Sequence, residues 1–309
     1  MKILVTGSSG QIGTNVALAL QSRGDQVVGV DTRENTWTDR IPTHIVDLRS
    51  PDFASVLSDG GFDVVVHMAA NAKVFELVEH PDRAMDNVLM LFNVLDYCRR
   101  GDTPIVFGSS REVYGDIHQH VTDEASADFV VAESPYSASK IAGEAFIYSY
   151  SQCYGLPYLV FRFSNVYGRY DNDLDRMERV IPLFLNRIAR DEPIVVYGPE
   201  KVFDFTHIDD CVSGVVAGID ALTAGRLNRQ TLNVAYGQGS TLVDLVNILA
   251  LAMRKTPIVT HEPSRVGEVT RYVADISKAQ ELLGYRPRVP LSAGLPKYIE
   301  WSRSVGAID

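Results

Sequence analysis

The sequence predicts an α/β protein built on a doubly wound parallel sheet, with a second, smaller lobe after it. Short apolar runs alternate with helical patterns down the first half of the chain, as expected for βαβ units. The runs end directly at glycine, serine or acidic residues, and the alternation loosens after about residue 168. A length of 309 residues suits about two lobes.

Six strands are expected in the first half, each a short apolar run bounded by turn residues. They lie at residues 3–5, 26–30, 44–46, 64–66, 105–107 and 158–161. Helices with apolar positions three and four residues apart are expected at 12–22, 84–99 and 137–154. Because helices connect parallel strands, these helices should cover the two faces of one sheet.

The sequence of the second half of the chain predicts fewer strands. Helices are expected at 179–190, 209–221 and 242–253, and a strand at 194–197. We therefore assign residues 1–168 to the sheet domain, with segments near 204–236 returning to it. Residues 169–309 mainly form the smaller lobe.

Composition and charge exclude several classes of protein. There are 29 Lys and Arg against 39 Asp and Glu, and the net charge of −10 argues against general binding to nucleic acid or anionic membranes. Cys98, Cys153 and Cys211 are widely spaced and lack metal-ligand spacing, which indicates a reducing compartment and no metal site. Without a signal peptide pattern or a long apolar run, we expect a cytoplasmic protein.

A glycine-rich run follows the first expected strand. Gly7, Gly10 and Gly13 form a GxxGxxG pattern that opens an apolar helix. Glycine lets the backbone approach a pyrophosphate, and the helix N-terminus adds unpaired N–H groups, although such a run also occurs in ordinary tight turns. The next strand ends in Asp31, which can accept both ribose hydroxyls of adenosine and would repel a 2′-phosphate. We therefore expect NAD, although Arg33 could receive a phosphate.

Asp47 and Leu48 follow the third expected strand. An acid at this position could hold the adenine amino group. An aspartate that merely caps the turn is an equally good interpretation.

Tyr136 and Lys140 are four residues apart, so they lie on one face of a helix. Ser109 and Ser110 follow the strand at 105–107, and open α/β sheets bind ligands at this end of their strands. For a tyrosine to act as a base near neutrality, its pKa must fall from ~10 to ~7. A lysine ammonium and an oxidised nicotinamide can lower it in a site poor in water.

Further motifs occur in a fixed order along the chain. They are His67-Met68-Ala69-Ala70, Asn87, Val113-Tyr114-Gly115, Ser134-Pro135, Arg162-Phe163-Ser164-Asn165-Val166-Tyr167-Gly168 and Asp204-Phe205-Thr206-His207-Ile208-Asp209-Asp210. Together with the glycine run, Asp31, Ser110 and the Tyr136/Lys140 pair, they resemble the extended short-chain dehydrogenase/reductase family. The pattern is most similar to NAD-dependent nucleotide-sugar epimerases and dehydratases of the UDP-glucose 4-epimerase type. The resemblance runs from Met1 to about Pro287.

The resemblance implies a Rossmann-type NAD-binding domain at 1–168 and a nucleotide-sugar-binding lobe at 169–309. It implies epimerisation at C4 of a UDP-sugar through a transient 4-keto sugar, with the hydride returned from the cofactor. In this mechanism Tyr136 takes the proton from the sugar 4-hydroxyl and Ser110 hydrogen-bonds that oxygen. Lys140 holds the nicotinamide ribose and lowers the pKa of Tyr136.

The resemblance also implies binding residues. Those expected to bind the cofactor are Gly7, Gly10, Gln11, Ile12, Gly13, Asp31, Asp47, Leu48, Ala69, Asn87, Tyr136 and Lys140. For the substrate, Asn165 would contact the phosphates and Arg265 would hold the diphosphate, while Val180 and Tyr197 would enclose the base.

The chain departs from this pattern at two positions. Relatives commonly carry an arginine before the Asp-Phe pair of the late motif, to meet the diphosphate, whereas this chain has Phe203. Arg162, Arg169 or Arg179 could compensate. Arg111-Glu112 also stands where plain epimerases carry small residues.

Glu112 occupies the position of a proton-transfer base, so a 4,6-dehydratase or decarboxylase is the alternative enzyme. Arg111 cannot protonate a departing hydroxyl, because a guanidinium keeps its proton up to a pKa above ~12. The two residues would then pair with each other or with a substrate carboxylate, tuning the choice of substrate. A non-catalytic dinucleotide-sensing regulator is a third possibility, against which the intact Ser110, Tyr136 and Lys140 set argues.

The helices expected at 84–99 and 137–154 carry more apolar residues than one sheet needs to cover. These residues include Leu91, Val94, Leu95, Phe146, Ile147 and Tyr150. The surplus predicts a homodimer formed through a four-helix contact, which is also the habit of the family.

Overall fold

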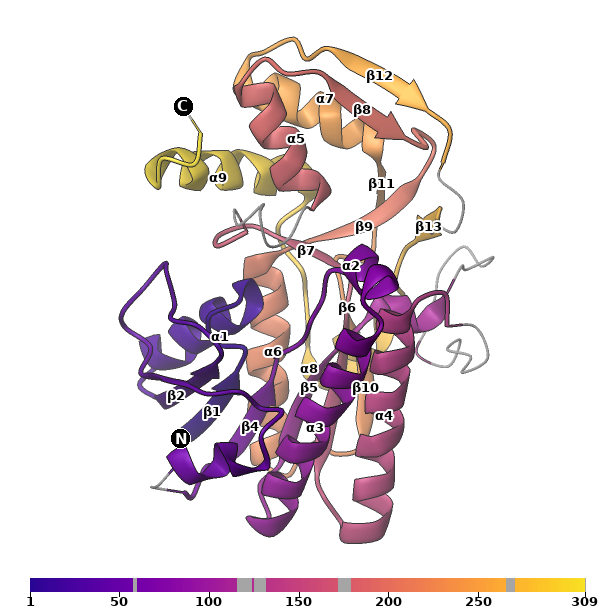
Figure 1. Ribbon diagram of the computed structural model, residues 1–309. Helices are drawn as coiled ribbons and strands as arrows, with labels where there is room; N and C mark the ends of the chain where they lie inside the picture. Colours follow the sequence, from indigo (N-terminus) through magenta and orange to yellow (C-terminus); the bar gives the residue numbers. More distant parts are fainter. Residues whose placement is uncertain (58–59, 116–123, 125–131, 172–178, 265–269, 309) are drawn as a thin grey trace.

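The computed structural model describes residues 1–57, 60–115, 124, 132–171, 179–264 and 270–308. Its centre is a parallel sheet of seven strands in the order β10-β6-β5-β4-β1-β2-β3 (Figure 1). The strands are β1 (Lys2–Thr6), β2 (Gln26–Asp31), β3 (Thr43–Ile45), β4 (Val64–His67), β5 (Ile105–Ser110), β6 (Tyr158–Phe163) and β10 (Gln230–Val234). All six strands predicted for the first half are confirmed, and β10 is the one that was not predicted.

Helices cover both faces of the sheet, which confirms the doubly wound fold class. On one face lie α1 (Gln11–Ser22), α6 (Ile208–Thr223) and α8 (Ser277–Leu283), and on the other α3 (Asp82–Arg100) and α4 (Pro135–Tyr154). Because both faces are covered, the inner strands β1, β4, β5 and β6 are largely apolar runs.

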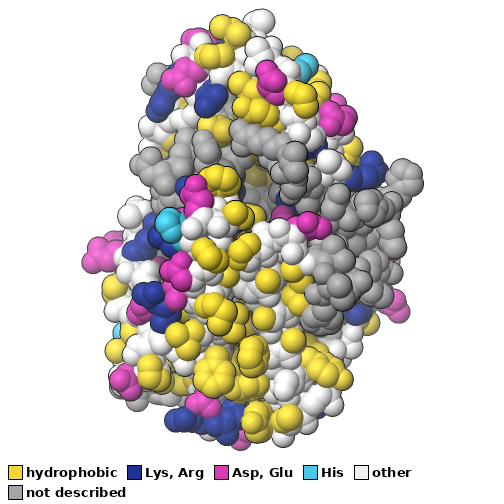
Figure 2. Space-filling view, turned by 45° about the vertical axis from the view of Figure 1, so that its right-hand side comes forward, with side chains coloured by type: hydrophobic (Ala, Val, Ile, Leu, Met, Phe, Trp, Pro, Cys, Tyr) yellow, Lys and Arg dark blue, Asp and Glu magenta, His cyan; other side chains and the backbone are white. Residues whose placement is uncertain are grey.

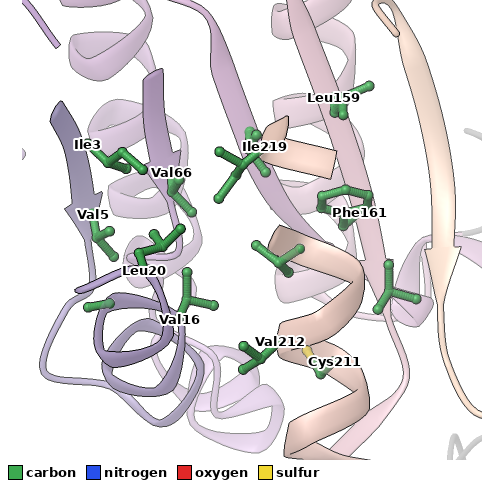
Figure 3. Packing of buried hydrophobic residues seen from close by; sticks show 14 of the residues in the cluster. Ile3, Val5, Val16, Leu20, Val66, Leu159, Phe161, Cys211, Val212 and Ile219 are labelled. Atoms are coloured by element: carbon green, nitrogen blue, oxygen red, sulfur yellow. The ribbon is translucent and has the colours of Figure 1, made fainter. Parts of the chain in front are cut away.

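Close packing explains how α1 and α6 sit on the sheet. Leu20 of α1 and Ile219 of α6 pack in one buried cluster with Val66 and Phe161 of the strands (Figure 3). Gly218 lets α6 approach β6 closely, because a Cβ there would lie 2.2 Å from the Phe161 ring.

A separate hydrophobic cluster forms at the other end of the molecule (Figure 1). It joins α5 (Val180–Ala189), α7 (Leu242–Met253) and α9 (Leu291–Ser304) with the strand pair β8 (Ile194–Tyr197) and β12 (Val259–Glu262). We call these five elements the cap. The helices expected at 179–190 and 242–253 and the strand at 194–197 therefore lie in the cap.

A small sheet connects the cap to the central sheet. It contains β7 (Asn165–Tyr167), β9 (Val202–His207), β11 (Gly239–Thr241) and β13 (Arg271–Tyr272). On β9, the Asp204 carboxylate accepts backbone N–H bonds from Tyr236, Gly237 and Ala274. Burial raises the pKa of Asp204 to about 6 against the effect of these donors.

Most of the elements that were not predicted are short, the exceptions being α9 and β9. They include η1 (Pro51–Val56), α2 (Val74–Glu79) and η2 (Arg111–Tyr114), together with α8, α9 and the strands of the small sheet. A strand of two or three residues carries too little alternation to be recognised in a sequence.

The structure corrects the prediction of which apolar residues of α3 and α4 are left uncovered by the sheet. Leu91, Val94, Leu95 and Ile147 are fully buried against the sheet and cannot contact a second copy. Different apolar side chains of these two helices are exposed, among them Met85, Leu89, Phe92 and Phe146. Figure 2 shows hydrophobic side chains spread over the lower half of the face that carries the helices. In the described part of the chain, no helix combines the length and apolar character needed to span a membrane.

A buried ion pair ties α4 to the sheet. Glu144 of α4 accepts hydrogen bonds from Arg162 of β6 at 3.0 and 2.6 Å and from the Ser109 hydroxyl of β5 at 2.6 Å. The side chains of Arg162 and Glu144 are only 7% and 12% exposed. The pair therefore sets the position of α4 relative to the ends of β5 and β6.

Glu144→Ala should destabilise the protein by about 3–5 kcal/mol, because it leaves the Arg162 charge buried without its partner. The free energy of unfolding in urea measures the effect. Asp96→Ala is the matched control, since Asp96 pairs at the surface with Arg99 and Arg100 and should contribute about 0–1 kcal/mol. Equal losses in the two variants would contradict the importance given to the buried pair.

Candidate active site

The site lies where β5 ends and α4 begins. Ser110 is the last residue of β5, and η2 follows it and packs against α4. Ser134 and Ser137 cap α4 reciprocally, since each hydroxyl accepts the other's backbone N–H, at 3.1 and 2.9 Å. Tyr136 is thereby fixed in the first helical turn, where the helix dipole favours a negative charge.

The structure brings Tyr136, Ser110 and Lys140 together, as the sequence predicts. Ser110 lies beside the Tyr136 hydroxyl and lowers the pKa of that phenol. The Lys140 ammonium lies 5.7 Å from the centre of the Tyr136 ring and donates a hydrogen bond to the carbonyl oxygen of Gly108 at 2.8 Å. Tyr136 and Lys140 are buried, so a pair of hydroxyls and a cation share a site poor in water.

Burial dominates the protonation of this site. It raises the pKa of Tyr136 to about 12 and lowers the pKa of Lys140 to about 8. Arg179 and Arg111 lower the pKa of Tyr136, whereas the Glu112 carboxylate raises it. At neutral pH the lysine is charged and the phenol is neutral, so the phenol needs further positive charge nearby to act as a base.

Arg111 and Glu112 are paired with each other. Their side chains meet at 2.9 Å, and the Arg111 guanidinium lies over the rings of Phe203 and Tyr272, 5.4 and 5.6 Å from the ring centroids. Phe203 stands where the resemblance leads us to expect an arginine. The two positions at which the chain departs from the family pattern are therefore in contact, since the Arg111 guanidinium lies over the Phe203 ring.

The Gly-rich loop between β1 and α1 fits a dinucleotide pyrophosphate. A Cβ on Gly7 would lie 2.6 Å from the backbone after β4, and one on Gly13 would lie 2.0 Å from the Gly7 carbonyl oxygen. The turn can close only with glycine at these positions. Gly10 is the N-cap of α1 and offers no side chain to it, so the N–H groups of Gln11 and Ile12 are available to an anion.

Asp31 lies at the end of β2, beside this loop. Its Oδ2 accepts the N–H of Ser9 at 3.0 Å, and its Oδ1 accepts the N–H of Arg33 at 3.3 Å. The Arg33 guanidinium donates to the Ser9 carbonyl oxygen at 2.8 Å and lies over the Trp37 ring. This orientation toward the loop favours the dinucleotide without a 2′-phosphate.

Asp47 and Leu48 are placed differently from one another. The Asp47 carboxylate accepts hydrogen bonds from the backbone N–H and the guanidinium of Arg49, at 2.9 and 2.6 Å. This arrangement favours the interpretation of Asp47 as a capping residue. Leu48 is buried with its side chain in the core, which leaves its backbone for any contact with a ligand.

The loop after β4 is fixed from two sides. Asn87 exchanges hydrogen bonds with the backbone of Asn71 at 2.7 and 3.0 Å, next to Ala69. His67 lies 2.7 Å from the Thr6 hydroxyl through Nδ1, and burial lowers the pKa of His67 to about 3. His67 is therefore neutral, and its bond to Thr6 links the ends of β4 and β1.

The residues predicted to bind substrate lie on separate elements. Asn165 begins β7 and donates from Nδ2 to the Asp204 carbonyl oxygen at 3.3 Å. Val180 is the first residue of α5 and Tyr197 the last of β8. Arg265 lies outside the described residues. The roles of these four residues stay predictions.

Three arginines could take over the role of the arginine that relatives carry at position 203. They differ in the partners that already hold them. Arg162 is committed to its buried carboxylate partner. Arg169 pairs with Asp209 at 2.8 Å. Arg179 pairs with Asp171 at 3.0 Å and also contacts the first residue of α1, so it lies beside the Gly-rich loop.

The chain is similar to known proteins in both sequence and fold. The model of the NAD dependent epimerase/dehydratase family matches residues 3–235. A putative UDP-glucose 4-epimerase of Methanocaldococcus jannaschii is 29% identical over 98% of this chain and 98% of its own.

Two solved structures are similar over nearly the whole chain. One is UDP-glucose 4-epimerase of Thermotoga maritima with UDP-glucose, with a TM-score of 0.89, 27% identity and 99% of each chain covered. The other is UDP-glucuronic acid 4-epimerase of Bacillus cereus with UDP-glucuronic acid and NAD. It has a TM-score of 0.87 and 26% identity, and covers 99% of this chain and 100% of that chain.

Proposed function

Because the chain belongs to the NAD-dependent epimerase/dehydratase family, we propose that it is a nucleotide-sugar 4-epimerase that interconverts UDP-glucose and UDP-galactose. The observation that supports this proposal best is the buried pair of Tyr136 and Lys140 beside Ser110 at the end of β5. A Gly-rich loop that fits a pyrophosphate and an acid that fits a ribose lie at the same edge of the sheet.

In this proposal Tyr136 accepts the proton of the sugar 4-hydroxyl and later gives it back. Ser110 holds the same oxygen by a hydrogen bond, and the Lys140 ammonium binds the nicotinamide ribose and keeps positive charge beside the phenol. NAD held by the Gly-rich loop and Asp31 would supply the hydride acceptor for C4, and its reduced form would supply the hydride that returns to the other face of the 4-keto sugar. Burial excludes water that could intercept the keto sugar.

The Arg111–Glu112 pair favours epimerisation over the alternative enzyme. A base that removes a proton at C5 needs a free carboxylate, whereas Glu112 is 2.9 Å from Arg111. A dehydratase also needs an acid at position 111, which a guanidinium does not provide. We therefore assign the pair to the electrostatics of Tyr136 and to the choice of substrate.

The reaction is tested with UDP-glucose, UDP-galactose and UDP-glucuronate in deuterium oxide, followed by NMR and mass spectrometry. We expect C4 epimers with unchanged mass and unchanged hydrogen at C5. Tyr136→Phe should lower kcat by ~10² or more with nearly unchanged substrate binding, because a general acid and base is lost. Deuterium at C5, or a product lighter by one water, would show that Glu112 acts as a base.

The pH profile tests the charges around Tyr136. Turnover should rise with pH, because only the deprotonated phenol accepts a proton. Arg111→Gln removes a charge that lowers the pKa of Tyr136 and should move the rising limb of kcat/KM upward by about one pH unit. Glu112→Gln should move it downward. Arg226→Gln, at an exposed arginine outside the site, is the control; shifts in the same direction for both site variants would contradict the assignment.

We further propose that the protein is a cytoplasmic homodimer. Met85, Leu89 and Phe92 form an exposed apolar stripe on α3, and Phe92 contacts Tyr150 of α4, near the half-exposed Phe146. Two copies that bring these stripes together would form a contact of four helices. The stripe replaces the buried residues that the sequence had indicated.

Phe92→Asp should convert the dimer to a monomer, since it places a charge in the apolar contact. Sedimentation velocity at micromolar concentration measures the change. Leu251→Asp is the matched control, because Leu251 is 82% exposed on α7 of the cap. A wild-type protein that sediments only as a monomer would exclude the dimer.

A further inference from the structure

Both tryptophans of the chain belong to one group of stacked aromatic side chains. The Trp37 ring, in the loop after β2, stacks on Tyr170 with centroids 5.3 Å apart. Tyr170 meets Trp301 of α9 edge-on at 5.6 Å, and Trp301 stacks on Tyr298 at 5.9 Å. We call these four residues the aromatic stack. It connects the sheet domain to the cap.

One end of the aromatic stack is attached to the Gly-rich loop. The guanidinium that lies over Trp37 belongs to Arg33, which donates to the Ser9 carbonyl oxygen. Asn35 donates to the Ser8 carbonyl oxygen at 3.1 Å. The loop that carries Trp37 therefore follows the position of the loop that would hold the pyrophosphate.

The other end of the aromatic stack reaches Arg179 through Asp171. The Tyr298 hydroxyl donates to the Asp171 carbonyl oxygen at 2.5 Å. Tyr170, next to it, has a φ of +63°, a strained conformation that the surrounding contacts must maintain. The Asp171 carboxylate in turn pairs with Arg179 at 3.0 Å. The aromatic stack therefore fixes the partner that orients Arg179.

Arg179 points at the start of α1. Its guanidinium donates to the side-chain oxygen of Gln11, the first residue of that helix. Gln11 and Asp171 are 7% and 6% exposed, and Gln11 Nε2 and Asp171 Oδ2 have no hydrogen-bond partner among the described residues. A cation and an unsatisfied buried amide donor thus lie at the N-terminus of α1, with the Asp171 carboxylate as the partner of the guanidinium. A cation beside a helix N-terminus is the chemistry of a phosphate site.

We propose that Arg179 binds the pyrophosphate of NAD from the cap side, and that the aromatic stack holds it there. The helix N-terminus meets the phosphates on one side and the guanidinium meets them on the other. Releasing the cofactor then requires the cap contact to open, so the protein keeps its cofactor between turnovers. The inference rests on NAD as the cofactor and is independent of the sugar proposed above.

The first test strips the purified protein of its cofactor and titrates NAD back by calorimetry. Arg179→Gln should raise the dissociation constant of NAD by about tenfold or more, since a charge-assisted hydrogen bond is lost. Arg190→Gln is the control, because it removes the same charge from an exposed residue at the end of α5. Arg179→Lys keeps the charge and should restore part of the affinity.

The second test uses the tryptophans as reporters. Because both lie in the aromatic stack, tryptophan emission should change when NAD binds to the wild-type protein. Trp301→Leu breaks the aromatic stack without removing a charge. It should speed the loss of NAD during dialysis. The melting temperature of the stripped variant shows whether the protein is still folded.

Equal NAD affinities in Arg179→Gln and Arg190→Gln would overturn the proposal. A variant that weakens UDP-sugar binding alone would also overturn it, since Arg179 would then serve the substrate diphosphate. Absence of epimerase activity together with the expected loss of NAD affinity would contradict only the function proposed above.

Discussion

The ion pair between Glu144 and Arg162 sets the frame on which the site depends. The catalytic group proposed here comes from two elements, since Ser110 ends β5 while Tyr136 and Lys140 lie on α4. Glu144 is on that same helix and binds Ser109 of β5 as well as Arg162 of β6. A shift of α4 along the sheet would break these bonds together with the contact between Ser110 and Tyr136. The geometry of proton transfer is therefore maintained by a carboxylate outside the reacting group.

The central sheet could be predicted because its inner strands can be recognised from the apolar pattern of their own residues. The inner strands β1, β4, β5 and β6 are largely apolar runs whose residues are buried on both faces. The grouping of Tyr136, Lys140 and Ser110 could be predicted for the same reason, since a spacing of four places two side chains on one helix face and strand ends meet at one edge. Glu144 continues that face, four residues after Lys140, and this spacing was the available indication of its role.

Contacts between distant segments could not be predicted in this way. No spacing relates Arg111 to Phe203, or Tyr170 to Trp301, because these residues meet only once the chain has folded. The apolar surplus on α3 was misjudged for a related reason. Leu91 and Leu95 face the sheet while Leu89 and Phe92 face outward, and composition alone does not show which face of a helix is covered.

The order of the strands in the central sheet bears on how the chain can be divided. β10 lies at the edge of the sheet beside β6, yet it follows α5, β8 and β9 in the sequence. A fragment ending at residue 168 would lack β10 and the helix α6 that covers β6, and would leave β6 as an open edge. An open edge of buried apolar residues pairs readily with other chains. The sheet of the first lobe is thus completed by later segments, and all seven of its strands exist only once residue 234 has been synthesised.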